Sequence, residues 1–448
     1  MLTLWGDRRR YCDGLSRRDF LRVGALGLGG LSLPGLLRLR AESARPARAR
    51  AVIMVCLAGG PSHIDTYDPK PDAPESVRGE FKPIRTNVVG FELSEQLPLQ
   101  AKIADQLALV RSVQFKEPMQ HQLEEVYTGH IEAARRPSFG SVISHQQRGG
   151  DPRLPRYVSL EYNVGGFHDH EHPRFLGTAH GPVHHNTGGG GLMNLRLRGP
   201  AKRLAERRQL LEGFDGLRRD LDTRGEMKAM DGYTAKAFDM LTSTTALDAF
   251  DLSKEPEQVR ERYGLKQSNK FHYAGTDNLH WPSDKFLLAR RLVEAGIPVV
   301  TLRAGSWDHH GNVLQGKSIF YNLRSELPLL DRSLYALATD LRERGLDQEV
   351  LVLVWGEFGR TPKISLAGRD HWPDASFALF AGGGLKRGQV VGETDSSGAR
   401  PRTRPLGPQN VLATVYQALG INPAAMVADG TGREVPLLAD AQPIEELF

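Results

Sequence analysis

Acidic and histidine side chains follow two short apolar runs in this sequence, and together they could bind a divalent metal ion. The runs, residues 297–302 and 350–355, are continuous and β-branched, as expected for strands buried on both faces. In open α/β sheets, ligands bind beyond the carboxyl ends of such strands. Carboxylates and imidazoles without cysteine favour zinc or manganese over calcium. The predicted metal ligands at these strand ends are Asp308, His310, Glu357, Asp370 and His371.

The spacing of these residues supports a shared site. Asp308 and His310 are two residues apart, so in an extended chain both side chains point to the same side and can reach one metal. Glycines on both sides of Glu357 allow a sharp turn that leaves Glu357 and Arg360 at the strand end. Arg360 could bind an oxyanion through two parallel hydrogen bonds, and Arg369 adds a second guanidinium. Each residue alone also has an ordinary structural explanation, so the prediction rests on their grouping.

The elements that must position these residues alternate between strand and helix. An apolar stripe at Leu330, Leu334, Leu337 and Leu341 predicts a helix directly before the strand at residues 350–355. This alternation predicts an α/β fold with a doubly wound, mostly parallel sheet. We expect one domain over residues 51–448, with a His/Gly-rich and helical insertion at about 163–280. Other runs that read as strands are residues 51–57, 107–113, 157–160 and 377–381.

Six of the fifteen histidines fall within eighteen positions of the insertion, interleaved with acids. Two interpretations stay open: a solvated polar loop, or a loop that closes over the active site and supplies a further ligand or substrate contact. The six are His168, His170, His172, His180, His184 and His185.

The first fifty residues read as an export leader. Arg17 and Arg18 precede a short apolar, glycine-rich stretch, which is typical of a twin-arginine signal, and small residues that suit cleavage follow it. The net charge of +5 comes from this leader, which carries eleven arginines and four acids. We therefore expect no nucleic-acid partner. Export would place the protein in the periplasm or outside the cell, and no later segment is apolar enough to span a membrane.

Several longer motifs resemble a bacterial family of exported proteins catalogued as domain of unknown function 1501 and often labelled sulfatase-like. The resemblance runs from about residue 50 to the C-terminus. It implies the alkaline phosphatase/sulfatase fold, which holds a two-metal site at the carboxyl edge of the sheet, so one or two ions are expected here. The motifs are Gly59-Gly60-Pro61-Ser62-His63-Ile64-Asp65, Leu288-Ala289-Arg290-Arg291-Leu292, Trp307-Asp308-His309-His310, Gly356-Glu357-Phe358-Gly359-Arg360-Thr361-Pro362 and Gly368-Arg369-Asp370-His371-Trp372.

The resemblance also implies roles for individual residues. Asp65 would be an early ligand after the first strand, and Asp308 with His310 would be the aspartate–histidine pair on one metal. Glu357 would stand where that fold usually has an Asp-His pair, although Phe358 follows it here. His371 would be the late histidine ligand.

The position of the usual nucleophile lacks a hydroxyl or thiol. In that fold a Ser, Thr or Cys precedes a Thr-Gly pair by about nine residues, and counting back from Thr128-Gly129 leads to Met119-Gln120-His121. Water activated by the metal could attack directly, or His121 could act as ligand or nucleophile. The site could also have lost ester hydrolysis.

The sequence thus predicts an exported metal-dependent hydrolase of phosphate or sulfate esters, in which Arg360 and Arg369 hold the anionic group of a sulfated or phosphorylated glycan. The alternative is a non-catalytic envelope protein that keeps a metal for stability or carbohydrate binding. An open coordination position favours the first prediction and a closed shell the second. The sequence sets no expectation for the oligomeric state.

Overall fold

The computed structural model describes residues 47–116, 123–131, 134–147, 149–160, 170–185, 244–273, 276–311, 313–440 and 442–448. An eight-stranded sheet runs through the middle of the protein. In spatial order its strands are β14 (Gln389–Val391), β4 (Leu107–Val113), β13 (Ser376–Gly382), β10 (Val350–Trp355), β1 (Ala51–Cys56), β9 (Val299–Arg303), β5 (Tyr157–Ser159) and β6 (Val183–His184).

The sheet is mostly parallel, which confirms the predicted fold class. β1 pairs in parallel with β10 on one side and with β9 on the other. Within this eight-stranded sheet, only the two ladders of β13, with β10 and with β4, are antiparallel. The carboxyl ends of β1, β9 and β10 therefore lie at the same edge of the sheet. All residues of β1 and β10 are buried, as their continuous apolar runs predict.

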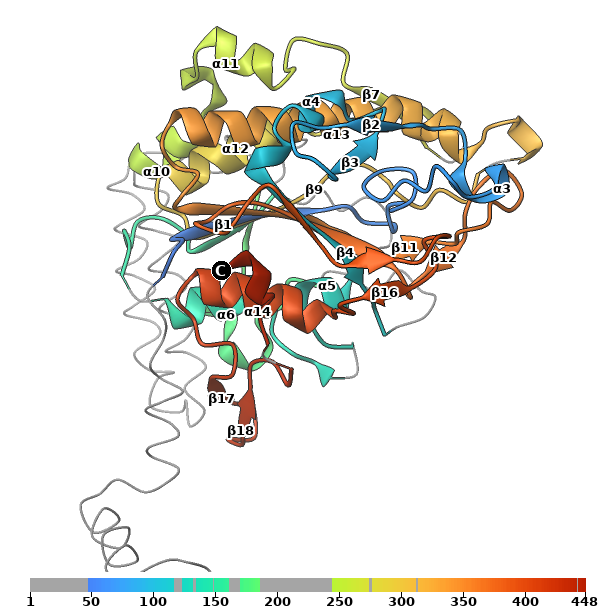
Figure 1. Ribbon diagram of the computed structural model, residues 1–448. Helices are drawn as coiled ribbons and strands as arrows, with labels where there is room; N and C mark the ends of the chain where they lie inside the picture. The colour runs from blue at the N-terminus through green and yellow to red at the C-terminus, as the bar shows by residue number, and fades with distance from the viewer. Residues whose placement is uncertain are drawn as a thin grey trace, which may run out of the picture.

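Helices cover both faces of the sheet (Figure 1). Alternate residues of β1 pack into opposite layers, Ile53 and Val55 into one and Val52 and Met54 into the other. On the first face lie α4 (Pro98–Ala101), α10 (Thr244–Phe250), α12 (Ser283–Glu294) and α13 (Ile319–Glu343). On the second lie α5 (Glu124–Thr128), α6 (Phe139–Gln146) and α14 (Pro408–Ala418).

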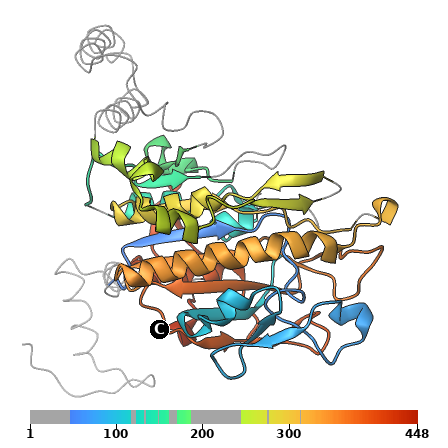
Figure 2. The same ribbon diagram turned by 90° about the horizontal axis from the view of Figure 1, so that it is seen from above.

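The long helix α13 connects the site edge of the sheet to β10. The Ser318 side chain accepts a hydrogen bond from the backbone N–H of Tyr321 and so caps its first turn. Further along, both carboxylate oxygens of Asp331 accept backbone N–H groups, from Leu99 and Gln100, at the start of α4. Figure 2 shows α13 crossing the molecule, with a hairpin of β7 (Lys270–Tyr273) and β8 (Thr276–His280) beside it.

Short elements complete the molecule. Three lie beyond the sheet at the right of Figure 1: α3 (Glu75–Arg78), β11 (Gly359–Arg360) and β12 (His371–Trp372). The others are β2 (Pro83–Arg85), β3 (Glu92–Ser94), α11 (Glu257–Arg262), β15 (Glu393–Thr394), β16 (Pro401–Thr403), β17 (Met426–Ala428) and β18 (Glu434–Pro436).

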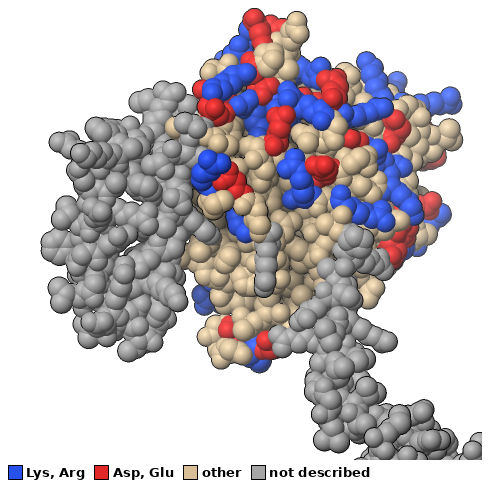
Figure 3. All heavy atoms as spheres, turned by 90° about the vertical axis from the view of Figure 1, so that its left-hand side faces the viewer, with Lys and Arg blue, Asp and Glu red and all other residues tan. Residues whose placement is uncertain are grey.

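The described surface and helices fit an ordinary α/β protein. On the face drawn in Figure 3, Lys and Arg are interspersed with Asp and Glu and form no field of one sign. Within the described ranges, no helix combines the length and apolar composition that a membrane span requires. Residues 1–46 of the leader lie outside the described residues, as does much of the predicted insertion.

Candidate metal site

Three of the predicted ligands converge at the carboxyl edge of the sheet. Asp308 Oδ1 lies 2.9 Å from His310 Nε2 and 3.0 Å from His371 Nε2, and the two Nε2 atoms are 3.0 Å apart. Zinc ligand atoms at about 2.0–2.1 Å in a tetrahedron would lie about 3.3 Å from one another. The triangle of one carboxylate oxygen and two imidazole nitrogens therefore fits a single divalent ion after a small expansion.

The loop after β9 carries two of these predicted ligands, and its successive side chains point alternately toward the site and toward the protein interior. Trp307 donates its backbone N–H to Ala58 at 3.0 Å, which ties the loop to the end of β1. The His309 ring is buried, and its Nε2 lies 3.1 Å from Glu326 Oε2 on α13. Because His309 points inward, its neighbours Asp308 and His310 both face the site.

A short hairpin supplies the third ligand. Arg360 on β11 and His371 on β12 are direct partners in an antiparallel pair. The Phe358 ring stacks on the His371 imidazole, with 4.4 Å between the ring centroids. Phe358 is the residue that departs from the resembled fold, and here it packs against a ligand.

Asp370 contacts the back of a ligand. His310 Nδ1 lies 3.0 Å from Asp370 Oδ1. An ionised carboxylate can only accept, so Nδ1 would donate to Asp370, and a metal would take the place of the proton that Nε2 shares with Asp308. The hydrogen bond with Asp308 raises the pKa of His310, against the effect of burial. Asp370, itself a predicted ligand, contacts the Nδ1 side of His310 and lies outside the triangle.

The group is accessible from solvent. The side chain of His310 is 43% exposed, that of Asp308 is 22% exposed and that of His371 is 11% exposed. These exposures place the triangle where solvent can reach it.

Arg369 and Asp65 form a buried ion pair away from the triangle. Arg369 Nε donates to Asp65 Oδ2 at 2.7 Å and Nη2 donates to Oδ1 at 2.9 Å, and neither side chain is exposed. Ser62 Oγ also donates to Asp65. In the structure the fork of Arg369 binds a protein carboxylate, and Asp65 lies outside the ligand triangle.

Arg360 and Glu357 also interact with protein atoms. Arg360 donates five hydrogen bonds to protein oxygens, including one of 2.7 Å to Asp308 Oδ1. Burial lowers the pKa of Arg360, and the Asp308 carboxylate opposes this effect. Glu357 Oε1 accepts the backbone N–H of Gly59 at 2.8 Å. Arg360 therefore directs its guanidinium at protein oxygens, and Glu357 lies outside the triangle.

The described members of the predicted histidine cluster contact different parts of the protein. His170 is buried, and its Nδ1 lies 3.0 Å from Glu124 Oε2. His180 contacts Ser144, His185 packs against Phe250, and none of the described members joins the ligand triangle. His168 and the candidate nucleophile His121 lie outside the described residues.

Tyr273 is a residue at the site that the sequence did not indicate. It ends β7, and its ring centroid lies 6.0 Å from that of His309. Its hydroxyl forms a hydrogen bond with Asp308, and burial, followed by the charge of Asp308, raises the pKa of Tyr273. Sequence spacing could not reveal this contact, because it depends on how the hairpin packs against α13.

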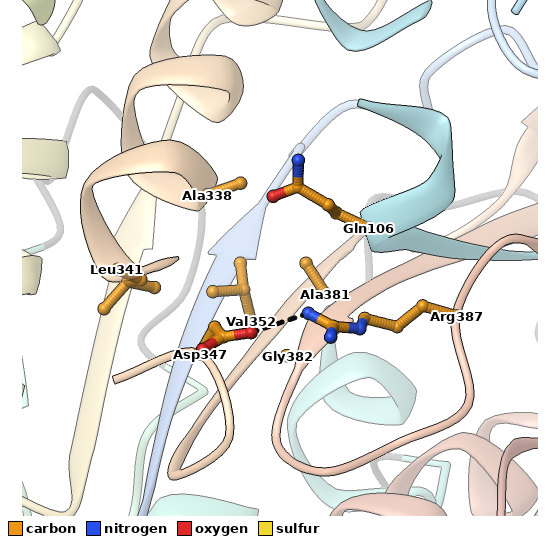
Figure 4. Close-up of a pocket in the computed structure, with 8 residues that line it drawn as sticks. All are labelled: Gln106, Ala338, Leu341, Asp347, Val352, Ala381, Gly382 and Arg387. Carbon is orange, nitrogen blue, oxygen red and sulfur yellow. Dashed lines mark hydrogen bonds and ion pairs between the residues drawn. The ribbon is translucent and has the colours of Figure 1, made fainter. Parts of the chain in front are cut away.

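A recess elsewhere in the molecule is unrelated to this chemistry. It lies between α13 and the strands near the start of β10, where Asp347 and Arg387 form an ion pair of 2.8 Å (Figure 4). The ligands follow the opposite end of β9 and β10. The recess therefore contributes nothing to the candidate site.

Comparisons with known proteins place the chain in a family. Solved structures with similar folds share 10–12% identity: PsFucS1 sulfatase from Pseudoalteromonas sp. (TM-score 0.37; 89% of this chain, 72% of that chain) and the lipoteichoic acid synthase LtaP from Listeria monocytogenes (0.35; 91% and 81%). The soluble domain of lipooligosaccharide phosphoethanolamine transferase A from Neisseria meningitidis is similar at a TM-score of 0.35, with 10% identity over 84% of this chain and 90% of that chain. No curated protein matches. A family model matches residues 49–448, and the chain therefore belongs to the family described as protein of unknown function (DUF1501).

Proposed function

We propose that this protein is an exported, metal-dependent hydrolase of phosphate or sulfate esters, with sulfated or phosphorylated glycans as its substrate class. The observation that carries the proposal is the convergence of Asp308, His310 and His371 in a solvent-accessible triangle at the carboxyl edge of the sheet. Catalytic zinc sites combine three protein ligands with one open position. The mixed oxygen and nitrogen donors suit zinc or manganese.

The chain's own residues would orient the ligands. A divalent ion held by the triangle would polarise an ester oxygen and lower the pKa of water. Asp370 keeps the Nδ1 proton of His310 in place, so that Nε2 faces the triangle. Arg360 and Tyr273 both donate to Asp308 and so limit the rotation of its carboxylate.

The nucleophile is either water or His121. Replacing His121 with alanine separates the two, because water attack would survive the change and covalent attack by the imidazole would not. Single-turnover assays of the variant, with its metal content measured alongside, give the answer.

A second candidate function has one observation in its favour. Arg360 and Arg369, the guanidinium groups expected to hold an anion, direct their hydrogen bonds at protein oxygens. A non-catalytic envelope protein that holds a metal for stability or for carbohydrate binding would not need guanidinium groups that hold a substrate anion.

The decisive experiment uses the mature protein loaded with zinc or manganese. We expect this protein to hydrolyse aryl phosphates, aryl sulfates or sulfated glycans. Chelator should abolish this activity, and Asp308→Ala and His371→Ala should each reduce it to background. His280→Ala, an exposed histidine on β8, is the matched control and should keep full activity. Tight metal binding without hydrolysis of any of these esters would instead support the non-catalytic candidate.

A further inference from the structure

Arg360 places a permanent cation inside the candidate site. Its side chain is fully buried. Nε donates to the carbonyl of Gly60 at 2.7 Å, and Nη1 donates to that of Arg369 at 3.0 Å. Nη2 donates to the carbonyls of Trp307 at 3.1 Å and of Gly59. The guanidinium thus sits in a cage of four carbonyl oxygens, which resembles the surroundings of a bound hard cation.

The same cage includes a metal ligand. Arg360 Nη2 lies 2.7 Å from Asp308 Oδ1, the oxygen that belongs to the triangle with His310 and His371. Arg360 Nη1 lies 3.5 Å from His310 Nε2. A metal in the triangle would therefore share the Asp308 oxygen with a guanidinium, which keeps its proton in proteins.

Two other nearby carboxylates accept hydrogen bonds from protein donors. Asp65 accepts two hydrogen bonds from Arg369 and one from Ser62. Glu357 accepts the N–H of Gly59, and its charge acts on Arg360. Among the described residues, Asp308, His310 and His371 form the group placed to hold an ion.

We propose that the site binds one divalent ion per chain, and that the guanidinium of Arg360 takes the oxygen-lined place beside it that a second ion could otherwise fill. This inference rests on the proposed function, because it concerns the same metal. It narrows the expected number of metal ions per chain from one or two to one. It also gives Arg360 a role in the site: a fixed positive charge next to the metal, present whether or not metal is supplied, that stabilises developing negative charge.

The first test counts metal in the mature protein. The chain is incubated with excess zinc, and separately with manganese, then freed of loosely bound ions by gel filtration and measured by elemental analysis. We expect one equivalent per chain. Two tightly bound equivalents would overturn the inference and leave the proposed function standing. No bound metal would overturn both.

The second test removes the built-in cation. Arg360→Ala should raise the manganese count from one equivalent to two, because the vacated cage is lined with oxygens that suit a hard cation. Arg360→Lys, which restores a positive charge, should stay at one equivalent. Arg324→Ala, which removes an exposed surface arginine, is the matched control and should also stay at one.

Circular dichroism and the melting temperature report whether each variant folds. A folded Arg360→Ala variant that still binds a single equivalent would overturn the inference. If this variant does not fold, the metal count of the wild-type protein and of Arg360→Lys decides the question.

Discussion

At the scale of single residues, each predicted ligand of the triangle has a second contact that limits its orientation. His310 contacts Asp370 through its outer nitrogen, His371 stacks on Phe358, and Asp308 accepts from Arg360. Such outer contacts commonly change metal affinity by roughly 10- to 100-fold. Two predictions belong at this scale.

Removing a predicted ligand should make the melting temperature of the protein independent of bound metal. Replacing His371 with alanine leaves two protein ligands, so chelator should no longer lower the melting temperature. In the wild-type protein, metal at a hundredfold excess over its dissociation constant stabilises the native state by roughly 2.7 kcal/mol. Differential scanning fluorimetry with and without chelator measures both effects. The His280→Ala control should respond to chelator as the wild type does, and an unresponsive wild type would contradict the metal site.

Removing the Tyr273 hydroxyl should weaken metal binding without unfolding the protein. Tyr273→Phe keeps the ring that packs near His309 and deletes the hydrogen bond to Asp308. We expect an affinity for zinc reduced by about tenfold, as for other outer contacts of metal ligands. Competition with a chromophoric chelator measures it. Tyr321→Phe, against the same hairpin at His272, is the control. An unchanged affinity of Tyr273→Phe would show that the hydroxyl does not position Asp308.

At the scale of elements, α13 and α4 are joined by a buried carboxyl group. Burial raises the pKa of Asp331 to about 6, although the backbone N–H groups of Leu99 and Gln100 oppose the change. Between about pH 4 and pH 6 the folded state therefore binds a proton that the unfolded state has already released. Stability from this group should fall as the pH rises through that window.

Asp331→Asn isolates this effect, because asparagine has a similar size and does not titrate. From pH 4.5 to pH 7.5, the free energy of unfolding of the wild type relative to the variant should fall by on the order of 2 kcal/mol. Urea denaturation at several pH values measures the difference. Curves of the two proteins that stay parallel over the whole range would show that the carboxyl titrates normally.

The sequence predicts the strands and helices better than it predicts the side-chain contacts at the site. Continuous β-branched runs predict β1, β9 and β10, and the leucine stripe predicts the second half of α13, because local composition decides burial there. The reversed direction of β13 has no local signal. A sequence also does not show which acceptor an arginine binds. Arg369 pairs with Asp65, about three hundred residues earlier in the chain.

At the scale of the whole molecule, export remains a prediction from the leader. Replacing Arg17 and Arg18 by lysine should trap the protein in the cytoplasm, because the twin-arginine route depends on that pair. Fractionation followed by immunoblotting locates the protein. Changing Arg38 and Arg40 to lysine in the same leader is the matched control and should leave export intact. Normal export of the Arg17/Arg18 variant would show that the leader uses another route.

The central place of β1 has a consequence for synthesis of the chain. Its sheet neighbours, β9 and β10, begin at Val299 and Val350, so the ribosome adds more than two hundred residues before either edge of β1 is covered. At roughly 5–20 residues per second this takes tens of seconds. During that interval an apolar strand with two open edges is exposed to aggregation. The nascent chain should therefore need a holdase chaperone, and the leader directly before β1 would emerge long before the protein it exports has folded.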